Sequence, residues 1–369
     1  MRLILAAAFI GGFVLCVALV PLTKRIARKW GLVDRPGGRK QHAGSVPLGG
    51  GIALLAAACL PLLAAAVLSA VWVGNPSLLP LPAALHDDMQ MAAERLPLLL
   101  KVLAGGLAMA ALGLWDDARN LRPSAKLIGQ VAIALCVSLM PQVRITLFVP
   151  SPWFQIPVTT VWIVLMVNCF NLLDNMDGQS GLVAFLTGSA LLVLALQTGQ
   201  YFIGGFVLAL LGALLGFLLF NLPPASIFMG DAGSMFVGYA LALATTLTTF
   251  LTPHAVNPIF PLMVPLVIFA VPLYDTVSVL VIRLRSARPL LGADRSHFSH
   301  RLMRLGMGDR MVLLTVALTV LATSPGATIP YGSPAWRLFI PALQALAVIL
   351  VIVQLELVSA ANRNRGSDQ

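Results

Sequence analysis

Long apolar stretches separated by short polar connections dominate the chain. Stretches close to the ~20 residues that cross a bilayer as a helix lie near 3–22, 47–73, 97–115, 126–142, 158–175, 181–198, 201–221, 232–252, 259–282, 311–329 and 336–358. This pattern predicts an all-α membrane bundle of eleven helices, with 126–142 and 181–198 short for a full crossing. We find no internal repeat and no soluble insert, so residues 1–369 are predicted to form one transmembrane domain.

The composition supports a polytopic membrane protein. Hydrophobic residues make up 59% of the 369 residues and charged residues 10%, whereas a soluble domain carries about 25% charged residues. The first apolar stretch ends at Lys24 and Arg25 with no small-residue cleavage site before them, so we interpret it as a membrane helix rather than a signal peptide. The four cysteines lie in apolar stretches without a CxxC pair and are interpreted as buried hydrophobic residues.

Basic residues predict the orientation of the helices. The connections 23–46, 116–126 and 283–310, together with the tail after 358, hold 19 of the 24 Lys and Arg residues. Since cytoplasmic loops carry the excess of Lys and Arg, we expect these connections and the C-terminus to face the cytoplasm and the N-terminus to lie outside. The predicted active face then consists of 23–46, 116–126, 175–181, 221–231 and 283–310.

Acidic residues gather on the same predicted face. Nine of the 14 Asp and Glu residues lie there before the C-terminal tail, most of them at helix ends beside Gly, Asn or basic residues. Carboxylate and amide oxygens bind hard cations, and Lys and Arg neutralise phosphate oxygens. Such a combination is typical of a magnesium-assisted phosphoryl-transfer site.

The most informative stretch is the polar end of the apolar segment 158–175. Two amides and two carboxylates recur there every third residue, as helical neighbours: Asn168, Asn171, Asp174 and Asp177. Ionised side chains near the bilayer interior cost ~2.5–3.5 kcal/mol each on insertion scales and therefore suggest a functional site. Gly178 and Gly181 follow, where the backbone can turn tightly or approach a ligand closely. A merely capped helix end needs fewer polar residues than these four.

Two further motifs carry acidic residues at helix ends. Asp116 and Asp117 are adjacent, so their repulsion favours a raised pKa or a nearby cation, although a solvated interfacial pair would look the same. After two prolines, the segment Gly230-Asp231-Ala-Gly-Ser begins a new helix, and we expect its free backbone N–H groups to attract phosphate. Asp231 could anchor a metal there, or could serve only as a helix N-cap.

The remaining polar segments are a loop near 34–51 and the arm 283–310. The loop contains Lys40 and His42. Taken alone, its composition would be explained by binding of anionic lipid headgroups. In the arm, His297 and His300 are spaced as zinc ligands could be, but neighbouring arginines oppose a dication and favour phosphate or sugar contacts. Asp275, inside the preceding apolar stretch, requires a partner.

Taken together and in this order, the motifs from Asp34 to His300 resemble the polyprenyl-phosphate N-acetylhexosamine-1-phosphate transferase family (glycosyltransferase family 4). The first loop and the arm are more similar to its WecA/TagO branch than to its MraY branch. The resemblance implies transfer of a sugar-1-phosphate from a UDP-sugar to polyprenyl (undecaprenyl) phosphate, with release of UMP, at the bacterial inner membrane. It also implies Mg²⁺ as the cofactor, with Mn²⁺ as the alternative ion.

The resemblance assigns roles to individual residues. Asp116 and Asp117 would handle the lipid phosphate, and with Asp174 they form the expected catalytic set. Asp231 and Asn171 would hold the metal. Substrate contacts are expected from Lys126, Asp177, Asn168, Gly230, Arg288, His297, His300, Arg301, Lys40 and His42.

The chain departs from the family pattern at two points, which leaves the identity of the sugar open. Asn175 replaces a usual glycine in the Asp174–Asp177 motif, and the arm lacks one of the usual histidines. We expect N-acetylglucosamine-1-phosphate or a related N-acetylhexosamine, with a phospho-muramoyl-pentapeptide transferase as the alternative. From a different class, an anionic-solute transporter remains open, although it predicts inverted repeats and mid-membrane charges. The expected partners are the UDP-sugar, the lipid phosphate and the bilayer, with no nucleic acid; a homodimer stays open.

Overall fold

The computed structural model describes residues 2–34, 45–78, 80–147, 149–248, 260–287, 289, 296–324, 343–350 and 352–353. The chain divides into two compact units, Met1–Thr248 and Thr249–Gln369, which are described separately.

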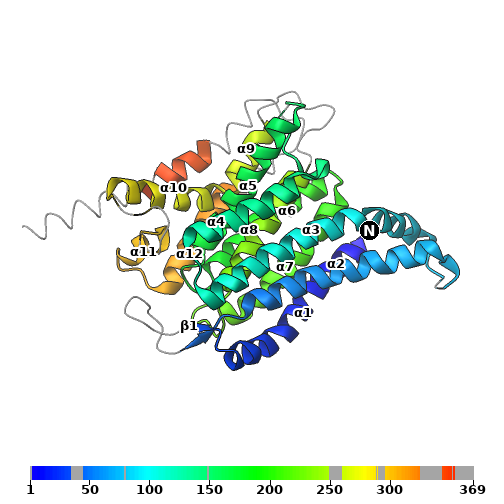
Figure 1. The fold of residues 1–369 in the computed structure, drawn as a ribbon, viewed down its shortest axis with the longest axis horizontal. Coiled ribbons are helices and arrows are strands. Elements are labelled where there is room, and N and C mark those ends of the chain that lie inside the picture. The colour runs from blue at the N-terminus through cyan, green and yellow to red at the C-terminus, as the bar shows by residue number, and fades with distance from the viewer. Residues whose placement is uncertain are drawn as a thin grey trace, which may run out of the picture. The chain divides into compact units, whose positions relative to one another are not determined.

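The first unit is a helical bundle (Figure 1). Its helices are α1 (Arg2–Lys29), α2 (Gly50–Gly74), α3 (His86–Arg119), α4 (Pro123–Ser138), α5 (Pro152–Leu173), α6 (Gln179–Gln197), α7 (Tyr201–Asn221) and α8 (Gly230–Leu247). Short 3-10 turns lie at Pro76–Leu78, Ala83–Leu85 and Pro141–Val143. Strands β1 (Val33–Asp34) and β2 (Val46–Pro47) form a two-stranded antiparallel ribbon in which Val33 lies opposite Pro47.

The second unit contains α9 (Phe260–Ile268), α10 (Ala270–Arg285), α11 (Phe298–Met303) and α12 (Asp309–Thr323). Residues 343–350 and 352–353 are also helical. One predicted helix, 259–282, is therefore two helices that meet at Phe269. Pro272 has no N–H to donate to the Ile268 carbonyl, which instead accepts a hydrogen bond from Ser324 Oγ at 3.1 Å. The short helix α11 in the arm was not predicted.

The all-α membrane class is confirmed. Within the described residues, six helices are long and apolar enough to cross a membrane: Ile4–Lys29, Gly50–Gly74, Ala83–Arg119, Pro152–Leu173, Gln179–Gln197 and Tyr201–Asn221. Large apolar side chains point outward from several of them, including Ile10, Leu68 and Leu107, as lipid-facing helices require. The protein is a multi-pass membrane protein, while the number of eleven helices and their orientation remain predictions.

Helix α8 is the core of the first unit. Its residues from Ala232 to Thr245 are buried, and it packs against α2, α3 and α5 (Figure 1). Glycine permits two of these contacts at backbone distance: a Cβ on Gly51 would lie 2.2 Å from Gly233 N, and a Cβ on Gly113 would lie 2.4 Å from Asp231 O. The second contact brings the acidic end of α3 against the first turn of α8.

Candidate active site

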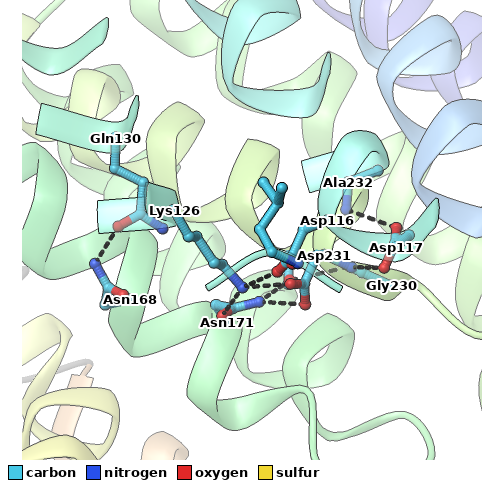
Figure 2. Close-up of polar contacts among 11 residues, drawn as sticks. Asp116, Asp117, Lys126, Gln130, Asn168, Asn171, Gly230, Asp231 and Ala232 are labelled. Atoms are coloured by element: carbon cyan, nitrogen blue, oxygen red, sulfur yellow. Dashed lines mark hydrogen bonds and ion pairs between the residues drawn. The ribbon is translucent and has the colours of Figure 1, made fainter. Parts of the chain in front are cut away.

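Four helices of the first unit each contribute one polar side chain to a common cluster (Figure 2). The four residues, which we call the carboxylate–lysine cluster, are Asp116 from α3, Lys126 from α4, Asn171 from α5 and Asp231 from α8. They are separated by up to 115 positions along the chain. All four were predicted as site residues, and the fold brings them together.

Lys126 lies at the centre of the cluster. Its Nζ is 2.9 Å from Asp116 Oδ2 and donates to Asn171 Oδ1 at 2.9 Å, and it also forms an ion pair with Asp231. The exposed fractions of the Asp116, Lys126 and Asp231 side chains are 11%, 16% and 29%. The cluster is therefore half-buried, and Asp231 is more open to solvent than Asp116 or Lys126.

Asn171 is oriented by three hydrogen bonds. Its Nδ2 donates to Asp231 Oδ1 at 2.8 Å and to Ser234 Oγ at 2.9 Å, while its Oδ1 accepts from Lys126. Ser234 Oγ in turn donates to the Gly230 carbonyl at 3.0 Å. The amide oxygen of Asn171 and the carboxylate of Asp231 thus face the same ammonium group at the first turn of α8. Sequence analysis did not assign Ser234 a role, although it lies three residues after Asp231.

Asp117 does not join this cluster but caps α8. Its Oδ1 accepts from Asp231 N at 2.8 Å and its Oδ2 from Ala232 N at 3.1 Å. The expectation that these N–H groups are free to bind phosphate is therefore wrong, because a carboxylate from another helix already occupies them. Gly230 has φ +68°, and a Cβ there would lie 2.7 Å from Asp117 Oδ2, so this position requires glycine for both conformation and space.

Asp116 and Asp117 have different environments despite being adjacent. Consecutive residues of an α-helix point about 100° apart, so the two carboxylates reach different partners. Asp116 Oδ1 accepts from Leu121 N at 2.7 Å, just after α3 ends at the left-handed residue Asn120 (φ 49°). Its other oxygen contacts Lys126. The expected repulsion between the pair is relieved by an ammonium for one and two backbone N–H groups for the other.

The predicted helical row of four polar residues is interrupted. α5 ends at Leu173, so Asn168 and Asn171 are helical, whereas Asp174 and Asp177 lie in the turn before α6. The turn is closed by Gly178 in the left-handed conformation (φ 73°), which glycine adopts without strain. The polar residues end the helix early because their side chains bond to backbone groups beyond it.

The turn binds to the loop between α7 and α8. Asp177 Oδ2 accepts from Ala225 N at 2.8 Å, and Asn221 Oδ1 accepts from Gly178 N at 3.1 Å. Burial, reinforced by the carboxylates of Asp231 and Asp117, raises the pKa of Asp174 well above its usual range. The negative charges of Asp231 and Asp117 thus favour the protonated form of Asp174.

Asn168 lies one helical turn from Asn171 and has a separate partner. Its Nδ2 donates to Gln130 Oε1 at 2.7 Å (Figure 2) and to the Val164 carbonyl at 2.8 Å. Gln130 is fully buried, and its Nε2 has no hydrogen-bond partner within the part of the chain that the structure describes. Sequence analysis missed Gln130; the available signal was its place four residues after Lys126, on the same helix face.

The arm residues lie in the second unit. His297 and Arg301 are buried and His300 is partly exposed. Asp275, whose partner the sequence left open, accepts hydrogen bonds from this arm. Lys40, His42 and Arg288 lie outside the described residues, so their predicted roles stay predictions.

The sequence model of glycosyl transferase family 4 matches residues 99–249, which include the whole carboxylate–lysine cluster. Over 363 residues, the chain is 27% identical to a probable undecaprenyl-phosphate N-acetylglucosaminyl 1-phosphate transferase of Bacillus subtilis, covering 96% of this chain and 91% of the relative.

Enzymes named undecaprenyl-phosphate alpha-N-acetylglucosaminyl 1-phosphate transferase are similar over most of their length. The Yersinia pestis protein is 28% identical over 320 residues, covering 84% of this chain and 80% of the relative. The Escherichia coli K12 protein is 27% identical over 335 residues, covering 86% of this chain and 82% of the relative. The chain is thus similar to glycosyl transferase family 4 through residues 99–249 and to these transferases over most of its length.

Proposed function

We propose that this protein transfers N-acetylglucosamine-1-phosphate from UDP-N-acetylglucosamine to undecaprenyl phosphate and releases UMP. The reaction would take place at the cytoplasmic face of the bacterial inner membrane. The observation that carries the proposal is the carboxylate–lysine cluster, in which one ammonium and the oxygens of three helices converge at a half-buried point. The names of the relatives support the same substrates.

The donor set of the cluster fits a magnesium ion. Asp231, Asn171 and Asp116 offer the carboxylate and amide oxygens that hard cations prefer. Among the described residues, no group of three His, Cys, Asp or Glu side chains is arranged to hold a metal ion. An ion here would therefore need the amide oxygen of Asn171 beside the carboxylates. Asp231 and Asn171 would hold the ion, which would neutralise charge on the pyrophosphate of the donor.

The protein's own residues then act on the two phosphates. Lys126 would contact a phosphate oxygen once it leaves the carboxylates, and so offset the negative charge that two phosphate groups bring together. Asp116, whose Oδ1 is fixed by Leu121 N, would orient the lipid phosphate or take its proton. The lipid phosphate oxygen then attacks the phosphorus that bears the sugar, in line with the leaving UMP. Asp117 would act indirectly, by fixing the first turn of α8 and hence Asp231.

The test is UMP release by the protein purified in detergent. We expect release that requires UDP-N-acetylglucosamine, undecaprenyl phosphate and Mg²⁺ together, and that falls at least 100-fold in Asp231→Ala, since loss of one preorganised charged group in such sites costs about 10²–10³ in rate. Asp87→Asn, an exposed acid in the first turn of α3, is the matched control and should keep full activity.

Other outcomes would redirect the proposal. Release with a different UDP-N-acetylhexosamine alone would keep the chemistry and correct the sugar. No release with any UDP-sugar from a sample that is folded by circular dichroism would contradict a transferase and favour an anion transporter.

A further inference from the structure

Ser234 is a fully buried residue of α8 whose hydroxyl contacts the carboxylate–lysine cluster through Asn171. Its Oγ accepts a hydrogen bond from Asn171 Nδ2 at 2.9 Å. The same Oγ donates to the Gly230 carbonyl at 3.0 Å, one turn earlier in α8. Because a hydroxyl has a single proton, the bond to Gly230 leaves only lone pairs for Asn171. Toward the cluster, Ser234 therefore acts as an acceptor.

The contacts of Asn171 determine which way its amide faces. Its Nδ2 has an acceptor on two sides, Asp231 Oδ1 at 2.8 Å and Ser234 Oγ. Its Oδ1 faces Nζ of Lys126 at 2.9 Å, which can only donate. A rotated amide would place its oxygen against two acceptors, so the nitrogen and the oxygen are assigned from this network. The amide oxygen therefore faces Lys126, at the centre of the cluster (Figure 2).

The three hydrogen bonds of the Asn171 amide would respond differently to a cation. Asp231 is itself a proposed metal ligand, so its oxygens would be shared between the ion and the amide. The bond from Lys126 would be lost when the ammonium moves away from Oδ1. The bond to Ser234 joins Asn171 to the backbone of α8 and does not involve an oxygen that the ion would need. It is thus the contact that can keep the amide oriented throughout.

We propose that Ser234 is a positioning residue that holds the Asn171 amide with its oxygen toward the cluster, so that Asn171 presents a fixed oxygen ligand to a divalent cation. The inference rests on the proposed function. Hard cations bind amide oxygens, and a rotated amide would direct its NH₂ group at the ion instead. A purely structural Ser234 would only tie α5 to α8, without any effect that depends on the Asn171 amide.

Ser234→Ala removes the acceptor and introduces the best helix former. Second-sphere partners of metal ligands are worth roughly 10–100-fold in metal affinity. We therefore expect the dissociation constant of Mn²⁺ from the substrate-free protein, measured by electron paramagnetic resonance, to rise at least about tenfold. Ser234→Cys keeps a weak acceptor and should shift the affinity in the same direction by a smaller factor.

Ser189→Ala is the matched control. Ser189 Oγ also donates to the carbonyl four residues earlier in its helix, that of Phe185, at 2.7 Å. The substitution therefore removes the same kind of intrahelical bond, but from α6, which contributes no residue to the carboxylate–lysine cluster. Its Mn²⁺ affinity should equal that of the wild type.

A double-mutant cycle separates positioning from a general loosening of α8. Asn171→Ala removes the amide that Ser234 orients. In this background, Ser234→Ala should leave the remaining Mn²⁺ affinity unchanged, because no amide is left to position. A further loss as large as in the wild-type background would mean that Ser234 acts on the helix itself, and would overturn the proposal.

The outcomes also separate this inference from the proposed reaction. Wild-type Mn²⁺ binding that Ser234→Ala leaves unchanged would overturn the role of Ser234, while the metal site and the transfer reaction would stand. A wild-type protein that releases UMP but binds no Mn²⁺ without substrate would also overturn the inference and leave the reaction standing. A protein that binds Mn²⁺ with the expected dependence on Ser234 but releases no UMP would support the inference and contradict the reaction.

Discussion

The side chain of Lys126 contacts the same oxygens that the proposed cofactor would need. Its Nζ contacts Asp231 and Asn171 Oδ1, and these are the two residues that we expect to hold the metal. In the absence of a cation, the ammonium compensates the charge of Asp116 and Asp231. A bound cation would compete with the ammonium for these oxygens, and the lysine would then become available to a phosphate.

Replacement of Lys126 by Gln should therefore tighten metal binding while it abolishes transfer. Two unit charges about 4 Å apart interact by roughly 4 kcal/mol at an effective dielectric constant of 20. Because the substitution removes the repulsion between the ammonium and the ion, we expect a gain of at least about tenfold in Mn²⁺ affinity. Titration of the substrate-free protein with Mn²⁺, followed by electron paramagnetic resonance, measures it. Lys101→Gln, at an exposed position of α3, controls for net charge. Weaker or unchanged binding in Lys126→Gln would show that the lysine only supports the fold.

Asp174 predicts a pH dependence of stability. Its pKa is raised in the folded protein by burial and by Asp231 and Asp117, so folding favours the protonated form. Stability is therefore unaffected below the ordinary aspartate pKa of about 4 and declines as the pH rises above it, since the unfolded chain releases the proton first.

Asp174→Asn should remove this decline. In metal-free buffer with EDTA, we expect the variant to melt at a higher temperature than the wild type at pH 7 and at the same temperature near pH 4. Thermal unfolding followed by intrinsic fluorescence across this pH range checks the prediction. An equal difference at both pH values would mean that the substitution acts through packing, not through the charge of Asp174.

At the scale of elements, the start of α8 determines the geometry of the site. Asp117 from α3 caps the first turn of α8, and Gly230 makes room for it. The same turn carries Asp231 into the cluster. A small displacement of this helix end would therefore move Asp231, a proposed metal ligand, and disturb the hydrogen bonds that Asp117 accepts from the first turn.

Gly230→Ala tests this arrangement. A left-handed non-glycine residue costs about 1–2 kcal/mol, and the added Cβ would also lie 2.7 Å from Asp117 Oδ2. We expect a loss of about 1–3 kcal/mol of stability and a loss of most transfer activity.

Gly199→Ala supplies the matched control for Gly230→Ala. Gly199 also has positive φ (69°), but a Cβ there meets nothing within 4 Å. This variant should show the strain cost alone, with activity retained. Equal activities in the two alanine variants would contradict the role of Gly230 in placing Asp117 and Asp231.

Much of the element order was predictable, but helix ends were not. The lengths of the apolar stretches predicted α1, α2 and α5 to α7, since a helix that crosses a bilayer needs about 20 consecutive apolar residues. The predicted stretch 158–175 ends two residues beyond the observed end of α5 at Leu173. The polar row keeps a helical spacing through Asp177, whose side chain instead bonds to another loop. The sequence also could not show that Asp117 caps α8, because such a contact joins residues 114 positions apart.

For the whole molecule, the membrane class and the family rest on properties distributed along the chain. Composition, apolar periodicity and the order of the motifs predicted both. The fold confirms the membrane class, and the comparisons confirm the resemblance to glycosyl transferase family 4. The convergence of Asp116, Lys126, Asn171 and Asp231 followed from motif order and predicted topology. Their individual partners did not, since hydrogen bonding depends on side-chain direction at each helix end.

The most direct test of the central claim follows the phosphorus atom. UDP-N-acetylglucosamine labelled with ³²P at the β-phosphate is incubated with the purified protein, undecaprenyl phosphate and Mg²⁺. Sugar-1-phosphate transfer predicts that the label moves into the lipid fraction while unlabelled UMP is released in equal amount, and that Asp231→Ala stops both. Label that remains in UDP while the sugar enters the lipid, or label that stays in the intact donor, would contradict the proposed reaction.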